Sequence, residues 1–435
     1  MIVGFAGLSH LGLVSSIVTA SKGCEVLAYD PKPGLCGDLR EGRLPTFEPG
    51  LADLLEVSRP RIRFTTDAAA LRQCDVIFFS LDVPTDTEGR SDLDPLRELI
   101  DGVAVGGSSE AVLVVLSQVP PGFTRRLADT LADRAQGRAP GVFYQVETLI
   151  IGRAVERALD PERLIVGCRD PRAELPAAYQ AVLDVFDCPI LRLGYESAEL
   201  AKISVNVCLA ASVAVANTLA ELCEVIGAEW SEVAPALKLD RRIGPHAYLS
   251  PGLGIAGGNL ERDLTTVQAL AAEFGTDAAL VEACLANSRY RRDWALRAVH
   301  SWLDPGDDCP TIAVWGLAYK VDTSSTKNSP ALALMESLRP LPIRAYDPQA
   351  RLDGSRLPNV LQVDSALEAC RGAAVLAVMT PWSEFATCDL SEVGRLMTGR
   401  ALVDPFGALD AARCAALGFS HLRLGWPRPL GTRAR

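Results

Sequence analysis

The amino-acid sequence predicts an α/β protein in which two Rossmann-like domains, each built on a doubly wound parallel sheet, are joined by a central helical dimerisation region. Three observations lead to this prediction. Short, almost continuously apolar segments alternate with helical patterns in the first part of the chain, as in a parallel sheet covered on both faces. The same alternation starts again at Thr311. Between these parts, residues 196–226 contain neither proline nor glycine.

In the first part, each predicted strand is a short apolar run. Residues 1–5 form the first strand, residues 7–12 a turn, and residues 13–22 a helix. The second strand, residues 25–29, ends at Asp30. Further strands are predicted at residues 75–81, 111–116 and 164–166.

The middle of the chain is predicted to be helical. Residues 196–226 form one helix, much longer than the usual helix of about a dozen residues. Its side chains are apolar nearly all round, which predicts burial between domains or against a second subunit, and we expect a homodimer through this helix. Further helical patterns cover residues 229–237 and 263–287.

The second α/β part repeats features of the first. Its predicted strands are residues 311–315, 343–346, 373–379 and 401–404, and its first helix is residues 329–338. Both parts contain a strand that ends in Tyr-Asp-Pro, at Tyr29 and at Tyr346. We therefore predict an N-terminal domain of residues 1–195, a central domain of residues 196–298 and a C-terminal domain of residues 299–435.

Composition limits the classes of partner. The chain has 435 residues, of which 49% are hydrophobic and 22% charged, so it can form several large cores. Its net charge of −11 argues against nucleic acid and against a basic membrane-binding surface. No apolar run reaches membrane-spanning length by inspection, and the N-terminus lacks the basic segment of a signal peptide, so we expect a cytoplasmic protein.

The metal-binding side chains are scattered. The 12 cysteines form no Cys-x-x-Cys pair, and the 4 histidines are far apart in the sequence. This pattern indicates neither a metal site nor a disulfide framework, and the cysteines are expected to be small buried side chains.

A glycine-rich turn follows the first strand. Gly7-Leu8-Ser9-His10-Leu11-Gly12 fits the dinucleotide fingerprint G-x-G-x-x-G except at Ser9, whose small side chain replaces the middle glycine. Asp30 ends the next strand at about the offset of twenty residues expected for a ribose-binding carboxylate, which favours NAD over NADP. We predict that Gly7, Ser9, His10, Leu11, Gly12 and Asp30 bind NAD; the alternative is a Rossmann-like domain that no longer binds a dinucleotide.

Two polar residues stand on the apolar central helix. Lys202 and Asn206 are four residues apart and so project from one helix face. An ammonium group and an amide that converge on a hydroxyl can stabilise an alkoxide while hydride leaves. The alternative is a solvated lysine, which the apolar character of this helix disfavours.

Many short motifs follow one another in a particular order. They are Gly42-x-x-Pro45-x-x-Glu48-Pro49-Gly50-Leu51, Asp82-Val83-Pro84-Thr85, Ser117-Gln118-Val119-Pro120-Pro121-Gly122, Val146-Glu147-Thr148-Leu149, Ser197-Ala198-Glu199-Leu200-Ala201-Lys202, Arg242-Ile243-Gly244, PGLGIAGGNLERD at residues 251–263, and Gly316-Leu317-Ala318-Tyr319-Lys320 with Ser329-Pro330. In this order they resemble the motifs of the UDP-glucose/GDP-mannose (nucleotide-sugar 6-) dehydrogenase family over nearly the whole chain.

The most informative departure from that family is Asn259. The loop of the family reads approximately P-G-x-G-x-G-G-S-C-x-P-K-D, which places the family's cysteine at Asn259, its proline at Glu261 and its lysine at Arg262, and keeps Asp263. In the family the cysteine attacks an aldehyde, and the adduct is oxidised to a thioester and hydrolysed. An amide cannot act as that nucleophile. We therefore expect the four-electron oxidation to be absent.

Other departures lie nearby. Glu147 matches the family's water-activating glutamate and can serve as a general base, or can be a plain strand-end carboxylate. Gln118 replaces a threonine that supports the hydrolytic water. Glu261 is either an acquired acid–base group or, as we favour, a carboxylate at a helix N-terminus. Lys327 and Asn328 stand where the family has arginine and glutamate.

The resemblance completes a set of predicted site residues. The catalytic candidates are Glu147, Lys202, Asn206, Asn259, Glu261 and Asp263. Pro84, Thr85, Ser117, Gln118 and Lys327 are added to the NAD site. The predicted substrate contacts are Glu147, Lys202, Arg242, Tyr248, Leu249, Gly252, Gly254, Tyr319 and Lys320.

These residues lead to a functional hypothesis. We expect an NAD-dependent enzyme that oxidises a carbinol of an NDP-sugar transiently and thereby catalyses redox-neutral dehydration or epimerisation, as in pathways to unusual antibiotic sugars such as the lincosamide octose. The alternatives are a two-electron dehydrogenase that releases a keto- or aldehydo-sugar, and a non-catalytic NDP-sugar-binding homologue. The choice between UDP and GDP stays open, although Arg242-Ile243-Gly244 leans towards UDP.

Overall fold

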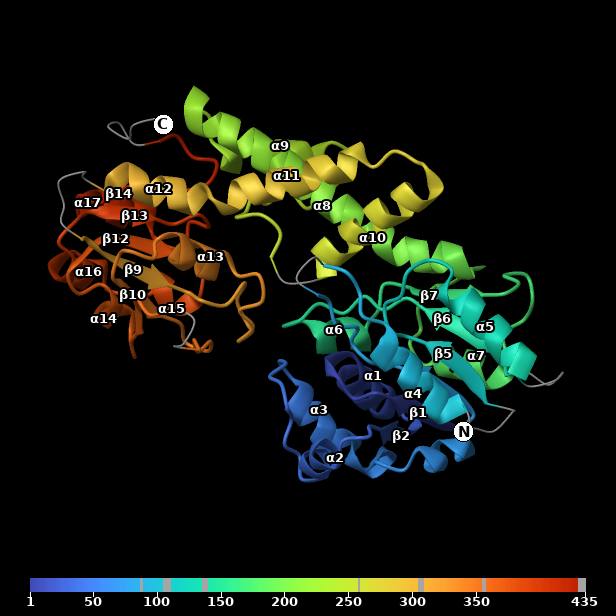
Figure 1. Ribbon diagram of the computed structural model, residues 1–435. Coiled ribbons are helices and arrows are strands. Elements are labelled where there is room, and N and C mark those ends of the chain that lie inside the picture. Colours follow the sequence, from blue (N-terminus) through green and yellow to red (C-terminus); the bar gives the residue numbers. More distant parts are fainter. Residues whose placement is uncertain are drawn as a thin grey trace. The chain divides into compact units, whose positions relative to one another are not determined.

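A computed structural model describes residues 1–86, 89–104, 111–134, 140–256, 259–303, 309–353 and 357–428 (Figure 1). The chain forms two compact units, Met1–Val205 and Asn206–Arg435. The long helix α8, Tyr195–Ile226, contains the boundary between them.

The first unit is built on an eight-stranded sheet in the order β3-β2-β1-β4-β5-β6-β7-β8. Neighbouring strands pair in parallel except β6 and β7, which are antiparallel. The strand order reverses between β1 and β4, which is where such sheets bind nucleotides. The strands are β1 Ile2–Ala6, β2 Glu25–Tyr29, β3 Ile62–Thr65, β4 Val76–Phe79, β5 Val112–Val115, β6 Val142–Gln145, β7 Leu164–Cys168 and β8 Ile190–Gly194.

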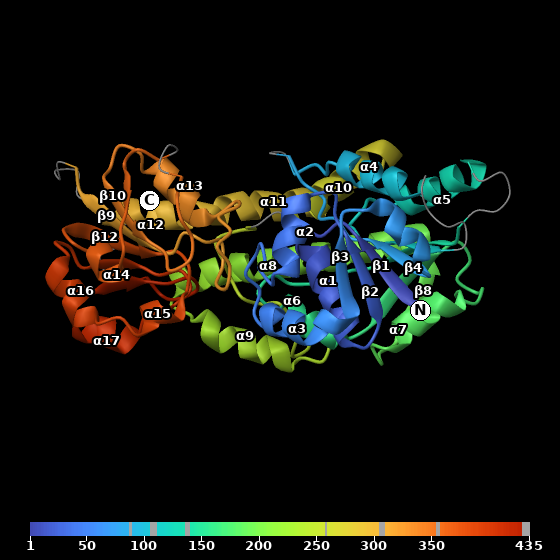
Figure 2. The ribbon, with the colours of Figure 1, turned by 90° about the horizontal axis from the view of Figure 1, so that it is seen from below.

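Helices cover both faces of this sheet (Figure 2). Side chains of α1, α3, α6 and α7 pack on one face, and those of α4, α5 and the start of α8 pack on the other. Alternate residues of β4 serve the two cores, since Phe78 belongs to the first and Phe79 to the second. The helices are α1 His10–Ser21, α2 Pro33–Arg40, α3 Leu51–Ser58, α4 Asp94–Ala104, α5 Phe123–Arg134, α6 Ala154–Leu159 and α7 Ala177–Asp184, with short 3-10 helices at Arg59–Arg61 and Ala68–Gln73.

The second unit combines helices with a six-stranded sheet whose pairs are all parallel, in the order β11-β10-β9-β12-β13-β14. The helices after α8 are α9 Trp230–Leu239, α10 Asn259–Phe274, α11 Ala279–Arg292 and α12 Trp294–Trp302. The strands are β9 Thr311–Trp315, β10 Ile343–Tyr346, β11 Val360–Gln362, β12 Ala373–Val378, β13 Ala401–Val403 and β14 Ser420–Leu422. Between the strands lie α13 Pro330–Ser337, α14 Ala366–Ala369, α15 Ser383–Ala386, α16 Leu390–Leu396 and α17 Ala411–Ala416.

The repeated Tyr-Asp-Pro motif holds the same kind of turn in each sheet. In the first sheet, Gly7 donates its N–H to the Tyr29 carbonyl at 2.9 Å, and Leu8 donates to the Asp30 carboxylate at 2.9 Å. Gly7 has φ +92°, a conformation that side chains of L-residues rarely adopt. The aspartate at the end of the second strand therefore holds the turn that follows the first.

The second sheet contains the same turn. Gly316 has φ +91° and donates to the Tyr346 carbonyl at 2.8 Å. The Asp347 carboxylate accepts from five donors at 2.6–3.1 Å, and its residue has no exposed surface. These donors are the N–H groups of Leu317, Ala318, Gln349 and Ala350 and the indole of Trp382.

The predicted fold class is confirmed, and the bounds of residues 25–29, 311–315 and 343–346 agree with β2, β9 and β10. The prediction of one helical pattern over residues 263–287 is wrong. The structure has two helices, α10 and α11, and α10 already begins at Asn259. Gly275, with φ +67°, ends α10 in a left-handed conformation that no helix continues through.

Helix α8 is less buried within the chain than its composition indicates. Ala210, Ala216 and Ala220 are buried, whereas Val215, Leu222 and Val225 are 53%, 50% and 62% exposed. By length and composition α8 can cross a membrane, so the statement that no apolar run reaches that length is wrong. The helix is rich in alanine, leucine and valine and has few charged residues, so its mean hydropathy is high. The core helix of a soluble protein can have the same length and hydropathy.

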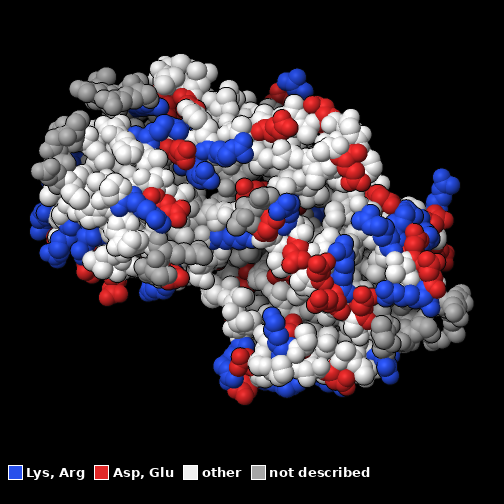
Figure 3. All heavy atoms as spheres, in the orientation of Figure 1, with Lys and Arg blue, Asp and Glu red and all other residues white. Residues whose placement is uncertain are grey.

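The surface carries charges of both signs. On the face drawn in Figure 3, Lys and Arg side chains lie among Asp and Glu side chains over both units. Several exposed charges pair with a residue three positions away, as Arg97 does with Asp94 at 2.9 Å and Arg153 with Glu156 at 2.6 Å. Such exposed pairs contribute little to stability.

Candidate functional site

The glycine turn after β1 fits a dinucleotide loop. A Cβ atom on Gly12 would lie 1.9 Å from the Gly7 carbonyl oxygen, so no side chain fits there. A Cβ atom on Gly7 would lie 3.1 Å from Leu81, and Gly7 also needs its positive φ. The N–H groups at the start of a helix that follows such a turn are donors for a phosphate group.

Ser9 replaces the middle glycine without blocking this turn. Its hydroxyl accepts from the Asp82 N–H at 2.7 Å and donates to the Ser80 carbonyl at 3.2 Å. The side chain is therefore folded back towards the end of β4. Ser9 has φ −69°, so its backbone does not require glycine.

Asp30 is buried, at 4% exposure, and accepts from the N–H groups of Leu8 and Lys32 at 2.9 and 3.0 Å. An ionised carboxylate has about four acceptor positions, so these two bonds leave capacity for ribose hydroxyls. The residues present thus fit NAD, with Asp30 able to hold both the turn and the ribose.

A carboxylate lies near the start of α1. The exposed side chain of Asp82 accepts from the Leu11 N–H through a long contact of 3.4 Å. The sequence placed Asp82 in a strand-end motif but did not indicate this contact. A negative charge at that place competes with a phosphate group for the same N–H groups.

Glu48 is a residue whose role the sequence did not reveal. Its side chain is fully buried and accepts from the N–H groups of Gly152 at 3.0 Å and Ala154 at 2.7 Å. The oxygen that accepts from Gly152 also lies 2.9 Å from Nε2 of His10, the first residue of α1. Glu48 therefore joins the nucleotide turn to the start of α6. The only sequence signal was its place in the Gly42–Leu51 motif.

The other predicted cofactor contacts lie after β4 and β5. The Ser117 hydroxyl is buried and donates to the Leu81 and Phe79 carbonyls at 2.7 and 3.2 Å. Gln118 follows it and is partly buried. Pro84 is exposed, and Thr85 pairs with Ser91 in a single β-bridge. Their predicted contacts with NAD stay predictions.

The structure brings Glu147 and Lys202 together. Oε2 of Glu147 lies 3.8 Å from Nζ of Lys202, and the two side chains are 18% and 12% exposed. The other oxygen, Oε1, accepts from the Leu149 N–H. The carboxylate is thus held beside the ammonium group that we expect to meet the substrate. Because both side chains are largely buried, this pair is shielded from solvent, unlike an ion pair on the surface.

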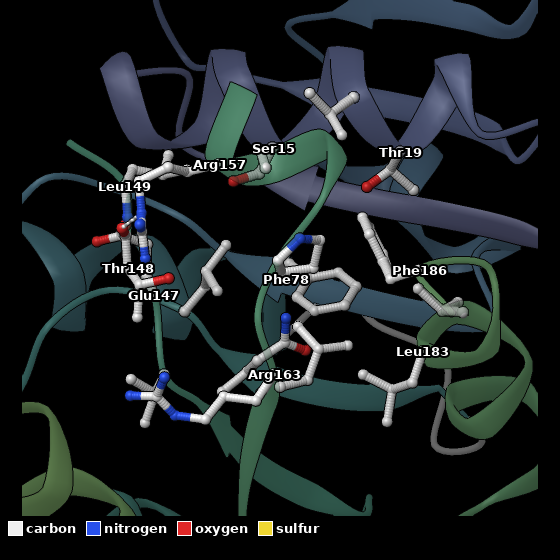
Figure 4. A pocket seen from close by; sticks show the side chains of 18 of the residues that line it. Ser15, Thr19, Phe78, Glu147, Thr148, Leu149, Arg157, Arg163, Leu183 and Phe186 are labelled. Carbon is white, nitrogen blue, oxygen red and sulfur yellow. Dashed lines mark hydrogen bonds between the residues drawn. The ribbon is translucent and has the colours of Figure 1, made fainter. Parts of the chain in front are cut away.

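Glu147 also borders a pocket on the face of the sheet that α1, α6 and α7 cover. Figure 4 shows Glu147, Thr148 and Leu149 on one side of this pocket, and Thr19 and Phe186 on the other. The cavity volume is about 70 Å³, which is room for a few water molecules. The apolar side chains Phe5, Phe78, Leu116 and Leu164 form much of its wall.

Glu199, on the same helix as Lys202, has a structural role. Its residue is fully buried, and its carboxylate accepts from the N–H groups of Gly122 at 2.6 Å and Thr124 at 2.8 Å. Burial raises the pKa of this carboxyl, and the hydrogen bonds oppose that shift. Glu199 thus caps the start of α5.

In the second unit, Asp263 joins α10 to α8. Nδ2 of Asn206 donates to Oδ2 of Asp263 at 2.5 Å, and Asp263 is 1% exposed. The guanidinium of Arg262 lies 3.4 Å from the other carboxylate oxygen. Asn206 is therefore oriented by a buried charge, which leaves its amide oxygen and second N–H as possible contacts for a ligand.

The predicted active-site loop is anchored on both sides of its glycines. Gly252 donates to Asn217 on α8 at 2.8 Å, and Ile255 donates to the Ser288 hydroxyl on α11 at 2.8 Å. Gly254 has φ +80°, and a Cβ atom there would lie 2.4 Å from the Ser288 carbonyl oxygen. Gly257 and Gly258 lie outside the described residues. Asn259 then begins α10 and is exposed.

The remaining predicted substrate contacts differ in exposure. Arg242 is 89% exposed at its side chain and pairs with Asp240 at 2.7 Å, and Tyr248 is 52% exposed. Leu249 is buried, and its carbonyl accepts from the Trp230 indole at 2.8 Å, so its side chain belongs to a core. Nζ of Lys320 lies 5.7 Å above the Tyr319 ring. Lys327 and Asn328 follow in the same loop.

Among the described residues, no group of three or more His, Cys, Asp or Glu side chains is placed to hold a metal ion.

Three family models match the chain. They are the NAD binding domain, the central domain and the UDP binding domain of the UDP-glucose/GDP-mannose dehydrogenase family, at residues 1–187, 196–289 and 313–411. Together with the fold and the nucleotide turn, they define an NAD-dependent nucleotide-sugar oxidoreductase. The chain belongs to the UDP-glucose/GDP-mannose dehydrogenase family, and NAD is its cofactor.

Individual relatives cover nearly the whole chain. The UDP-glucose 6-dehydrogenase TuaD of Bacillus subtilis is 29% identical over 99% of this chain and 94% of its own length. The UDP-glucose 6-dehydrogenase of Rickettsia bellii is 27% identical over 98% of this chain and 99% of its own. Among solved structures, a UDP-glucose dehydrogenase from Pyrobaculum islandicum superposes with a TM-score of 0.83 and 27% identity, over 93% of each chain.

Proposed function

We propose that this protein oxidises a carbinol of a UDP- or GDP-linked sugar only transiently, and that the carbonyl formed drives dehydration or epimerisation before the hydride returns to the sugar. The observation that carries the proposal is Asn259, which stands at the exposed start of α10 where the family's loop has its cysteine. An amide cannot form the covalent adduct that a second oxidation needs. The product would serve the biosynthesis of an unusual sugar, such as an antibiotic octose.

The two polar residues of α8 act on the reacting oxygen in this proposal. Lys202 and Asn206 project from one helix face, and charge that develops on the substrate oxygen is stabilised by the ammonium and amide groups. Bound NAD supplies the hydride acceptor. Glu147, beside Lys202, is placed to take a proton from the hydroxyl or from the carbon next to the new carbonyl.

A panel of UDP- and GDP-sugars tests the proposal. Purified protein is incubated with each sugar, and small molecules are identified by mass spectrometry before and after. A product isomeric with its substrate, or one water lighter, with NAD unchanged in amount, is the expected result. Uronic acid formed by the unmodified protein would refute it.

A second experiment addresses the lost cysteine. Asn259→Cys alone should form no detectable uronic acid, because Gln118 and Glu261 also differ from the family pattern. Asn259→Ser, which has no thiol and a similar small polar side chain, is the matched control. Acid from the cysteine variant alone would show that the other departures matter little.

A second candidate function is a two-electron dehydrogenase. The relatives are named UDP-glucose 6-dehydrogenases, and this favours a net oxidation that releases NADH over a redox-neutral reaction. It predicts free NADH in equal amount to a product two hydrogens lighter. A non-catalytic binding homologue is disfavoured by the Glu147–Lys202 and Asn206–Asp263 contacts, because a binding protein has no need of an alkoxide-stabilising pair.

We further propose a cytoplasmic homodimer through α8, within the domain division 1–195, 196–298 and 299–435. The exposed side chains of Val215, Leu219, Leu222 and Val225 support the dimer, since a row of apolar side chains along one helix is costly in water. Sedimentation at low micromolar concentration tests it, and a monomer there would refute the dimer.

A further inference from the structure

Two departures from the family pattern contact each other in the structure. Nδ2 of Asn328 donates to Oε2 of Glu261 at 2.9 Å, although 67 residues separate them in the sequence. The family has a proline at the position of Glu261 and a glutamate at that of Asn328. In this chain the carboxylate therefore lies on α10, at position 261, whereas in the family it lies on the loop after β9, at position 328.

The direction of Glu261 argues against an acid–base role beside Asn259. An α-helix turns by about 100° per residue, so Glu261 lies about 200° around α10 from Asn259, whereas Asp263 lies only about 40° from it. Asn259 and Asp263 thus share a helix face, and Glu261 belongs to the other side. This side meets Asn328.

The partner loop is built to present Asn328. The Tyr319 N–H donates to the Ser325 carbonyl at 3.0 Å, so the loop closes on itself. The Ser329 hydroxyl donates to the carbonyl of Leu317, just after β9, at 2.7 Å. Asn328 has φ +51°, a left-handed conformation that asparagine tolerates better than most residues. The same loop carries Tyr319, Lys320 and Lys327, which are predicted to contact the ligands.

We propose that Glu261 and Asn328 are positioning residues whose hydrogen bond holds the loop of residues 319–328 against the start of α10 and so sets the affinity for the sugar nucleotide. This inference rests on the proposed sugar-nucleotide function of that loop. A proline at position 261 has no side-chain acceptor, so this particular contact is specific to chains with the exchanged pair. Glu261 is not the group that moves a proton.

Two isosteric substitutions test the contact. Asn328→Asp removes the donor and sets two carboxylates against each other, whereas Glu261→Gln keeps an acceptor for Asn328. The double variant E261Q/N328D reverses the hydrogen bond, since the amide introduced at position 261 can donate to the carboxylate introduced at position 328. Glu273→Gln, on the exposed far part of α10, is the matched control.

Affinity is measured by calorimetry with the full chain, saturating NAD, and UDP-glucose or GDP-mannose as probes. Asn328→Asp should weaken binding about ten-fold, Glu261→Gln by no more than about two-fold, and the double variant should recover most of the loss. The melting temperature of all variants should stay near that of the wild type, because the contact is exposed. A variant N328D that binds like the wild type, or a double variant that binds no better than N328D, overturns the inference.

Two further outcomes separate this inference from the proposed function. If the unmodified protein binds no UDP- or GDP-sugar, the proposed function itself fails. If Glu261→Gln keeps its affinity but loses kcat by about a hundred-fold or more, Glu261 is an acid–base catalyst, and the positioning role is wrong.

Discussion

Replacing Glu48 tests how the nucleotide turn is held. The Glu48 carboxylate is fully buried and accepts from the Gly152 and Ala154 N–H groups, and it lies beside His10. In Glu48→Gln, the amide oxygen can keep the Ala154 bond, but the NH2 group then faces the Gly152 N–H. The Gly152 N–H is then left without an acceptor in the interior.

The expected loss follows from that unsatisfied group. A buried donor without a partner costs about 1–3 kcal/mol, so we expect the free energy of unfolding of the first unit to fall by about 2 kcal/mol. For a unit of this size, that corresponds to a decrease in melting temperature of about 4–8 °C. Glu48→Ala removes all three contacts and should lower it further.

Calorimetric melting of the full chain measures this effect, together with NAD affinity by titration. NAD binding should weaken as well, because Glu48 orients His10 at the first residue of α1. Glu56→Gln, an exposed carboxylate on α3 paired with Arg59, is the control and should melt like the wild type. If Glu48→Gln melts within about 1 °C of the wild type, the cost assigned to an unsatisfied buried donor is wrong.

Three further predictions concern single residues. Lys202→Met should lower kcat by about 10²–10³-fold while NAD binding persists, and stopped-flow turnover that falls less than about five-fold would contradict the alkoxide role. Asp82→Asn should tighten NAD binding about two- to five-fold by calorimetry, because it removes a negative charge from the start of α1; weaker binding would contradict the competition. The hydrogen bond from Arg125 lowers the pKa of Glu196 from 4.5 to about 2, so this pair stabilises the fold above pH 4.5 and that contribution is lost as the pH falls towards 2. Glu196→Gln should therefore reduce the pH dependence of the melting temperature in that range, and an unchanged profile would contradict it.

Much of the fold could be predicted because its central strands are plain apolar runs. Val76–Phe79 and Val112–Val115 are fully buried at every position and need no alternation to be recognised. The strands that the sequence did not predict are β3, β6, β8, β11 and β14, and all of these except β6 lie at an edge of their sheet. In β8, Leu191 is 44% exposed and Arg192 is also exposed, and β14 has only three residues. Such edge strands are defined by pairing with a neighbour, which no local pattern encodes.

The site residues named from the sequence stay predictions, and the contacts among them could not be predicted from the sequence. Lys202 and Asn206 share a helix, so their common face follows from the helical period. Glu147 and Lys202, and likewise Glu261 and Asn328, are far apart in the sequence and meet only through the tertiary fold. The buried role of Glu48 was hidden for the same reason, because the N–H groups that donate to it lie 104 and 106 residues away in the sequence.

The turns held by Tyr29-Asp30 and by Tyr346-Asp347 indicate how the molecule evolved. Both sheets use the order 3-2-1-4-5-6 over their first six strands, and both hold the turn after their first strand in the same way. This is what duplication of one ancestral module would leave behind. The copies have since diverged: Asp30 accepts two hydrogen bonds, whereas five donors, including the Trp382 indole, saturate Asp347. The Asp30 carboxylate can still accept hydrogen bonds from a ribose, whereas the Asp347 carboxylate is saturated. The second half must therefore bind its nucleotide through other atoms.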